Sequence, residues 1–168
     1  MTSEAADLRR AVQADLDGII ALNGQVQRLH ADMLPDEFRA EPDPAQVAQF
    51  LHEAVSGDRG IVLVAETRAG LIGYLWAEEQ AAREGLFRRQ QPRLMLHHLV
   101  VDRAHRRRGV GRRLLRAAFE EADARGLGAV VLETYSMNET AARFFAGAGF
   151  APHRVMMIRR GDEESEDR

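Results

Sequence analysis

The chain has 168 residues, of which 45% are hydrophobic and 29% charged, and its formal net charge at pH 7 is −3. These values are typical of one globular domain with a sizeable core. The sequence has no cysteine, which excludes disulfides, thiolate metal ligands and cysteine nucleophiles. No apolar run is long enough to cross a membrane and the first residues do not resemble a signal peptide, so we expect a cytoplasmic protein without a membrane partner.

The N-terminal third predicts one short strand and two helices. The strand is expected over 8–12, and Asp15 is expected to cap a helix that carries apolar residues on one face as far as Leu29. Asp43 and Pro44 have the residue types of the cap and first position of a second helix, which the glycines at 57 and 60 end.

The middle of the chain predicts three strands. Apolar runs at 61–65 and 71–77 flank a turn at Ala69-Gly70 and indicate a hairpin. Residues 78–92 are polar and irregular, so we expect a long loop or a helical turn there. A strand over 94–101 follows, and the spacing of Leu96, Leu99 and Val101, three and then two, indicates a bulge.

The last third predicts a helix, a strand, a second helix and a final strand. The first helix begins near Gly109 to Gly111 and ends at about Arg125. A strand over 129–135, a short helix from Asn138 with its apolar side chains inward, and a strand over 150–159 complete an α/β sandwich. We expect one domain over 1–160 and a charged, disordered tail over 161–168.

The junction that follows Val101 predicts an anion site. Residues 103–116 hold seven arginines and no acid, whereas the rest of the chain has 16 basic residues against 26 acidic ones. The first amides of a helix lack partners within the helix, and glycine at 109 and 111 leaves them open to an anion. A Walker loop and a dinucleotide fingerprint are both excluded, because Arg112 and Leu114 stand where a lysine and a third glycine would be needed. We expect a pyrophosphate.

Two motifs carry a resemblance to a known family. The pattern Arg-x-x-Gly-x-Gly, from Arg106 to Gly111 after a Leu-x-Val-Asp strand end, closely resembles the acetyl-CoA-binding motif of the GNAT acetyltransferases. A second family pattern is matched by Asn138, Ala141, the pair Phe144-Phe145 and the pair Gly149-Phe150. With the order of elements over about residues 6–160, the resemblance implies a GNAT-type three-layer α/β/α sandwich around a mixed, largely antiparallel central sheet that is splayed at the cofactor site.

The resemblance also implies an activity and a cofactor site. It implies direct attack of an amine, from a small molecule or a peptide, on acetyl-CoA as co-substrate, with no metal. Pantetheine would bond to the main chain near Leu99 and Val101, and the Val101 amide would be the oxyanion donor. Asn138 would bond near the sulfur or simply cap its helix, and Phe145 would line the site. The pyrophosphate would be held by Arg106, Arg107, Arg108, Gly109, Val110, Gly111 and Arg112.

The sequence does not decide which groups act as the general base and the general acid. Glu133, His97 or a water is the candidate base, and His98 would point to the opposite face from His97 in a regular strand. Phe145 stands where the family commonly has a tyrosine that protonates the thiolate, so Tyr135 or water would replace it.

Two other functions compete with that of an N-acetyltransferase. Phe145 permits a non-catalytic acyl-CoA-binding or sensing domain. The arginine cluster alone would suit nucleic acid, but no recognition helix or aromatic platform accompanies it, so we expect no nucleic-acid partner. An exposed strand edge near the C-terminal end would favour a homodimer.

The acceptor amine would be chosen by residues 30–42 and 78–92. The acids of these segments, including Asp32, Asp36 and Glu37, either attract a cation or are merely solvated.

Overall fold

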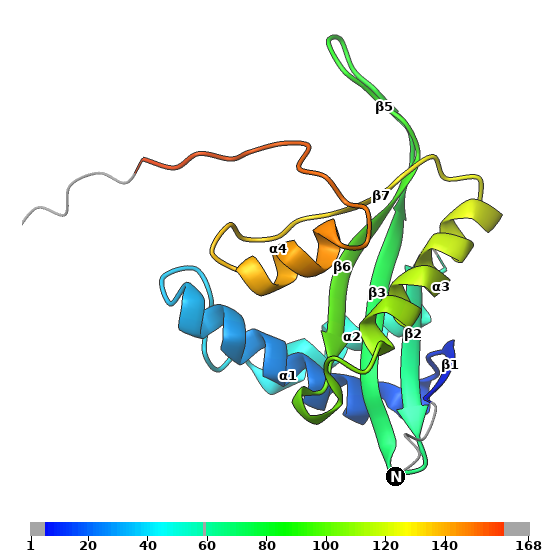
Figure 1. Cartoon of the computed structure of the whole chain (residues 1–168), viewed down its shortest axis with the longest axis vertical. Coiled ribbons are helices and arrows are strands. Elements are labelled where there is room, and N and C mark those ends of the chain that lie inside the picture. Colours follow the sequence, from blue (N-terminus) through cyan, green and yellow to red (C-terminus); the bar gives the residue numbers. More distant parts are fainter. Residues whose placement is uncertain (1–5, 59, 160–168) are drawn as a thin grey trace, which may run out of the picture. The chain divides into compact units, whose positions relative to one another are not determined.

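The computed structural model (Figure 1) describes residues 6–58 and 60–159. The chain divides into two compact units, one ending at Glu133 and the other beginning at Thr134, and each is described by itself. The charged tail predicted over 161–168 lies outside the described residues.

A mixed sheet forms the centre of the first unit. Its described strands lie in the order β1, β2, β3, β6, β7, and neighbours are antiparallel except β6 and β7, which are parallel. This confirms the predicted mixed, largely antiparallel sheet and the predicted hairpin of β2 and β3. The strands are β1 (Asp7–Arg10), β2 (Gly60–Thr67), β3 (Gly70–Gln80), β6 (Arg93–Val101) and β7 (Val130–Leu132).

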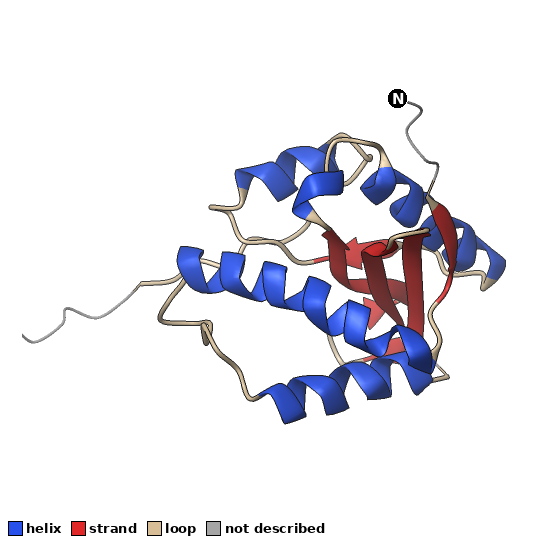
Figure 2. Cartoon of the chain, turned by 90° about the horizontal axis from the view of Figure 1, so that it is seen from below, coloured by secondary structure: helices blue, strands red, loops and turns tan. Residues whose placement is uncertain are grey.

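Helices cover both faces of this sheet, as Figure 2 shows. The helices α1 (Leu16–Met33) and α2 (Pro44–Ser56) pack on one face, and their buried apolar side chains form a core with alternate residues of the strands. This core contains Ile19, Leu22, Leu51, Ala54, Val62, Val64, Tyr74, Trp76 and Val100. Among the described residues, no helix has both the length and the apolar character of a membrane span.

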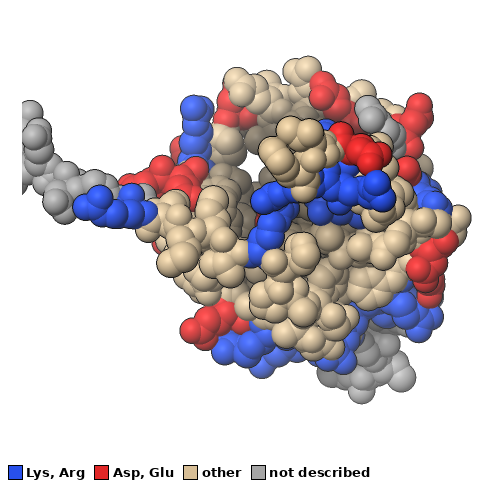
Figure 3. Space-filling view, turned by 90° about the horizontal axis from the view of Figure 1, so that it is seen from above, with Lys and Arg blue, Asp and Glu red and all other residues tan. Residues whose placement is uncertain are grey.

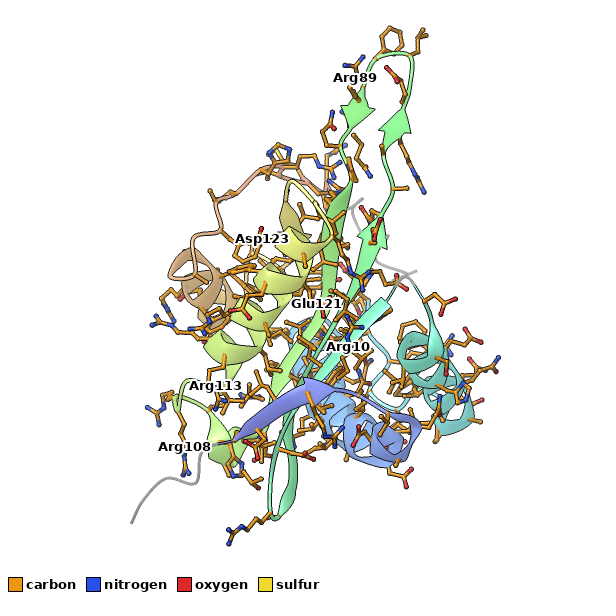
Figure 4. All side chains as sticks on the ribbon, turned by 90° about the vertical axis from the view of Figure 1, so that its right-hand side faces the viewer. Arg10, Arg89, Arg108, Arg113, Glu121 and Asp123 are labelled. Atoms are coloured by element: carbon orange, nitrogen blue, oxygen red, sulfur yellow. The ribbon has the colours of Figure 1, made fainter. Side chains whose placement is uncertain are left out.

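The opposite face is covered by α3 (Val110–Ala124). Leu114 and Leu115 of α3 are completely or almost completely buried, and a side chain at Gly73 of β3 would come within 3.4 Å of Leu114. An ion pair between Arg10 of β1 and Glu121 also ties the helix to the edge of the sheet (Figure 4). The three-layer α/β/α arrangement is therefore confirmed.

The two predicted helix caps differ in outcome. Asp43 accepts a hydrogen bond from the Ala45 amide at 2.9 Å and Pro44 opens α2, as predicted. Asp15 precedes α1 as predicted, but its carboxylate makes no capping bond to that helix. It accepts instead from the Val12 amide and from the Arg9 guanidinium, and these bonds, chiefly those from Arg9, hold the pKa of Asp15 below its ordinary value.

Residues 78–92, predicted as a loop or helical turn, form an extended ribbon instead. After β3 ends, β4 (Arg83–Glu84) pairs with β5 (Arg89–Gln90), and the Gly85 amide closes the turn by donating to the Arg88 carbonyl. The prediction is wrong because a ribbon that projects into solvent needs no apolar face. The ribbon projects at the top of Figure 1, and Figure 3, which views the molecule from above, shows basic side chains gathered among residues without charge.

The second unit holds α4 (Glu139–Ala146) but little other regular structure. Asn138 caps α4 as predicted, accepting from the Ala141 amide at 3.1 Å. The apolar side chains of α4, predicted to face inward, are at most half-buried. The strand predicted over 129–135 is only Val130–Leu132, and the one predicted over 150–159 does not form, since a β-prone segment needs a partner strand and Val155–Ile158 are exposed.

Candidate functional site

The strands β6 and β7 part halfway along β6. Their pairing covers Leu94–Leu96 of β6 and Val130–Leu132 of β7, whereas β6 continues to Val101. Within the described residues, the part of β6 over 97–101 pairs with β3 on one edge and with no strand on the other edge. The sheet is therefore splayed at the position that the family resemblance implies.

The main chain of β6 offers hydrogen-bonding groups along this open edge. The Asp102 amide donates to the Ile72 carbonyl of β3 at 2.9 Å. Because successive residues of a strand turn their amides to opposite edges, the amides of Val101 and Leu99 point away from β3. Arg106 Nε donates to the Val101 carbonyl on that side at 3.0 Å, which places its guanidinium beside the same edge.

A network around Asp102 holds the beginning of the arginine-rich turn. The Asp102 carboxylate accepts from Gln25 Nε2 of α1 at 2.9 Å and from the Ala104 amide at 2.9 Å, and it pairs with His105 Nδ1 at 3.0 Å. These bonds, chiefly that from Gln25, lower the pKa of the Asp102 carboxyl. The bond between Gln25 and Asp102 is not visible in the sequence, because nothing in the local pattern shows that α1 reaches this turn.

The turn itself exposes its cations and its backbone. Gly109 precedes α3 at a φ of 82°, in the left-handed region that favours glycine, and nothing lies within 4 Å of the place of a Cβ atom there. Arg106, Arg107 and Arg108 are exposed, and in Figure 4 Arg108 and Arg113 project from the chain beside the start of α3. Val110 is buried and anchors the first turn of the helix.

The bulge predicted in β6 falls at His97. Trp76 pairs with His98 and Ala77 with Leu96, so His97 is the extra residue. The bulge turns both rings toward Trp76: His97 stacks on the indole with centroids 4.3 Å apart, and His98 meets it edge-on at 5.0 Å. The prediction that His98 points to the opposite face is therefore wrong, because it assumed regular alternation.

His98 is committed to a buried network. The fully buried Tyr74 hydroxyl accepts from Asn23 Nδ2 at 3.1 Å and lies 2.9 Å from His98 Nδ1. Burial raises the pKa of Tyr74, so the hydroxyl keeps its proton and shares a hydrogen bond with Nδ1. Burial, with the nearby His97 and His30, lowers the pKa of His98 to about 4. His98 is a neutral structural residue.

His97 is the accessible member of the pair. Its side chain is 28% exposed, and its Nε2 lies 3.1 Å from Glu78 Oε2 of β3. Leu96 and Leu132 form the last pair between β6 and β7. His97 is the next residue of β6, and the exposed Glu133 is the first residue after β7. The structure thus brings the two candidate bases to the same fork in the sheet. Trp76 was missed because it lies in the apolar run of β3, and Glu78 because the strand was expected to end before it, at residue 77.

The remaining predicted site residues belong to the second unit. Tyr135 is half-buried, and the Asn138 amide donates to its carbonyl at 2.9 Å. The Phe145 ring packs against Phe144 and Phe150, with centroids 5.2 and 5.6 Å away. Their roles toward a cofactor stay predictions.

The segment predicted to select the acceptor is folded against α1. The Phe38 ring lies 4.9 Å from that of His30, and Gln27 Nε2 donates to the Arg39 carbonyl. The pKa of His30 is lowered by burial. The acids Asp32, Asp36 and Glu37 are exposed to solvent, so the apolar side of this segment, rather than its acids, faces the protein.

Comparison with known proteins identifies relatives of this architecture. Residues 25–150 match the model of the acetyltransferase (GNAT) family. N-acetyltransferase family 8 member 3 of Rattus norvegicus is 34% identical over 87 residues, which are 52% of this chain and 36% of that protein. Human N-acetyltransferase 8 is 32% identical over 51% of this chain and 34% of its own length. The match thus spans about a third of these curated relatives.

Solved structures share the fold over nearly the whole chain. The BH1408 protein from Bacillus halodurans, as a tetramutant, has a TM-score of 0.84 and 25% identity, covering 92% of this chain and 99% of that one. The aminoglycoside N-acetyltransferase AAC(6')-Iy, solved in complex with CoA, has a TM-score of 0.76 and 17% identity, covering 95% of this chain and 97% of that one.

Proposed function

Because the chain belongs to the GNAT acetyltransferase family, we propose that it transfers the acetyl group of acetyl-CoA to an amine of a small molecule or peptide. The observation that carries the proposal is the open edge of β6, which leads directly into the arginine turn. An extended acyl-pantetheine fits such an edge, since it can bond to the main chain as a further strand would. The pyrophosphate fits the exposed guanidinium groups and first amides of α3.

Each part of the edge has a distinct task in this proposal. The Leu99 and Val101 amides bind the acyl-pantetheine arm, and the Val101 amide stabilises the charge on the acetyl oxygen, which is worth about 3 kcal/mol of barrier for one such donor. The pyrophosphate is held by Arg106, Arg107, Arg108, Gly109, Val110, Gly111 and Arg112. Asn138 and Phe145 are proposed to contact the cofactor.

His97 is the base that we favour. It is partly exposed, lies at the fork, and is not committed to a buried network as His98 is. Proton removal makes the amine lone pair available for direct attack, so that no acyl-enzyme is needed. Glu133 is the second candidate at the same fork, and Tyr135 or water protonates the thiolate.

A small amine is supported as the acceptor by the solved relatives. AAC(6')-Iy is an aminoglycoside acetyltransferase, and one of its structures holds a bisubstrate analogue of CoA joined to an acetylneamine. The acceptor of this chain reaches the fork from the α1 and α2 face, on which His97, Glu78 and Trp76 lie.

The test is release of CoA thiol from acetyl-CoA across a panel of amines, with acetyl-CoA binding measured separately. The panel contains an aminoglycoside, a polyamine, an arylalkylamine and a peptide with a free N-terminus. Amine-dependent thiol release with an acetylated amine as product is the expected result. Tight binding without release on any amine would support a non-catalytic acyl-CoA sensor instead.

A further inference from the structure

We propose that Glu78 is a positioning residue that fixes the tautomer of His97, so that Nδ1 of that ring is the atom that takes the proton of the acceptor amine. The inference rests on the proposed acetyl transfer and deepens it. It assigns a role to a carboxylate on β3, outside both sequence motifs that identify the cofactor site.

The geometry of the pair supplies the first step. Glu78 Oε2 lies 3.1 Å from His97 Nε2, within hydrogen-bond distance. An ionised carboxylate can only accept hydrogen bonds, so a hydrogen bond between these two groups would need a proton on Nε2. A neutral imidazole has one ring proton, and the lone pair is then on Nδ1. The pair thus leaves Nδ1 as the basic atom.

The bulge explains why this pair exists. In the register of β3 and β6, Glu78 stands opposite Met95, and His97 is the residue inserted between the pairings of Leu96 and His98. An inserted residue rotates the side chain out of regular alternation, which brings the His97 ring over Trp76 and next to Glu78. Without the bulge, His97 would face α3, away from the carboxylate.

A platform keeps the ring in this orientation. The Trp76 side chain is 6% exposed, and its indole plane lies 25° from the His97 ring at a centroid distance of 4.3 Å. Trp76 is itself held by the Phe50 ring, which meets it edge-on at 5.1 Å. The stack restricts the plane of the imidazole, and the carboxylate favours the ring flip that places Nε2 beside Glu78 Oε2.

Nδ1 accepts the proton that the amine nitrogen gives up, and the imidazolium that forms is stabilised by Glu78. The amine lone pair forms the C–N bond to the acetyl carbon, the C–S bond breaks, and the sulfur leaves with its electron pair. The thiolate takes up a proton from water or, through Tyr135, from solvent, and the imidazolium then gives its proton to solvent, which restores neutral His97.

The test measures the tautomer of His97 by NMR and then changes its surroundings by mutation of Glu78. Ring-nitrogen NMR shifts of His97 are recorded in the full-length protein at about pH 8.5, well above the ordinary histidine pKa. The same spectra and the acetyl-transfer kinetics are recorded for Glu78→Gln, in which the amide can either accept or donate. The matched control is Glu79→Gln, since Glu79 is the next residue of β3, points to the opposite face and pairs with Arg125.

We expect the wild-type ring to carry its proton on Nε2 and the Glu78→Gln ring to populate both tautomers. We also expect kcat to fall at least about tenfold in Glu78→Gln with an unchanged KM for acetyl-CoA, while Glu79→Gln resembles the wild type. A proton on Nδ1 in the wild type, or an unchanged tautomer in Glu78→Gln, would overturn the inference. The wild-type spectrum reports the tautomer without a variant and without turnover. A failure of the proposed acetyl transfer would therefore be distinguished from a failure of the tautomer inference.

Discussion

The Tyr74 hydroxyl lies 2.9 Å from Nδ1 of His98 and joins this ring to Asn23 on α1. Two adjacent histidines of one strand thereby differ in chemistry: His98 is bound within the core, and His97 is held at the surface by Glu78. The bulge in β6 makes this division, because it brings both rings to one face and leaves only one of them accessible.

The buried His98 predicts a loss of stability in mild acid. Its pKa is about 4 in the fold and 6.5 in the unfolded chain. Above 6.5 the ring is neutral in both states, and between 6.5 and about 4 only the unfolded state takes up the proton, so stability falls with pH. The difference between the two values corresponds to at most about 3 kcal/mol.

Urea unfolding at about pH 7 and about pH 4.5 checks this prediction. Replacing His98 with Phe should reduce the difference in unfolding free energy between the two conditions, although it also costs stability at both by breaking the bond to Tyr74. His52→Gln, at an exposed position of α2, is the control and should leave the difference unchanged. If the unfolding free energy changed by the same amount between the two pH values in wild type and in His98→Phe, the account would be contradicted.

Replacing His97 with Ala should lower kcat about 100-fold, the contribution expected of a general base, with KM for acetyl-CoA unchanged. Steady-state kinetics with and without added imidazole are the measurement, and imidazole should restore part of the rate. His52→Ala should behave as the wild type. An unchanged kcat would exclude His97 as the base, and a loss in Glu133→Gln would then transfer the role to Glu133.

Replacing Gly111 with Leu should weaken CoA binding at least about tenfold, because a side chain there would cover the first amides of α3. Calorimetric titration with CoA is the measurement, and the Tm is expected to change little. Gly128→Leu is the control, since nothing lies within 4 Å of a Cβ atom at that loop position. Equal CoA affinity in wild type and Gly111→Leu would argue against the pyrophosphate assignment.

Replacing Asp15 with Ala should lower the unfolding free energy by about 2 kcal/mol, the scale of hydrogen bonds to a buried charged group. Asp15 is 8% exposed and is bonded by Arg9 and by the Val12 amide. Urea denaturation is the measurement. Glu120→Ala, which breaks an exposed pair with Arg116, should cost about 0.5 kcal/mol or less. Similar losses of unfolding free energy in the two variants would show that the buried bonds of Asp15 stabilise the fold no more than an exposed ion pair does.

Much of the fold could be predicted because local patterns and tertiary structure agree. Asp43 and Pro44 begin α2 where the residue types require it, and the spacing of Leu96, Leu99 and Val101 reveals the bulge. The ribbon of β4 and β5 could not be predicted, because its residues bury no face and leave no hydrophobic period. The segment Val155–Ile158 shows the converse, since strand propensity without a partner strand gives no strand.

The arginine turn proposed to bind the cofactor could be predicted more fully than the surroundings of the candidate bases. The turn from Arg106 to Gly111 lies in one continuous segment, so its chemistry is visible in the order of residues. The pair of His97 and Glu78 joins two strands through a register that the bulge shifts, and Gln25 reaches Asp102 from another helix. Such relationships depend on packing between segments, which spacing along the chain does not show.

The central claim is that acetyl-CoA lies along the open edge of β6 and ends at the arginine turn. Titrating the labelled full-length protein with CoA and following its backbone amide resonances tests this claim most directly. We predict that the largest changes fall on Leu99, Val101 and residues 106–112, while the amides of the β4 and β5 ribbon remain unchanged. Saturable CoA binding that leaves Leu99, Val101 and the arginine turn unperturbed would contradict the account.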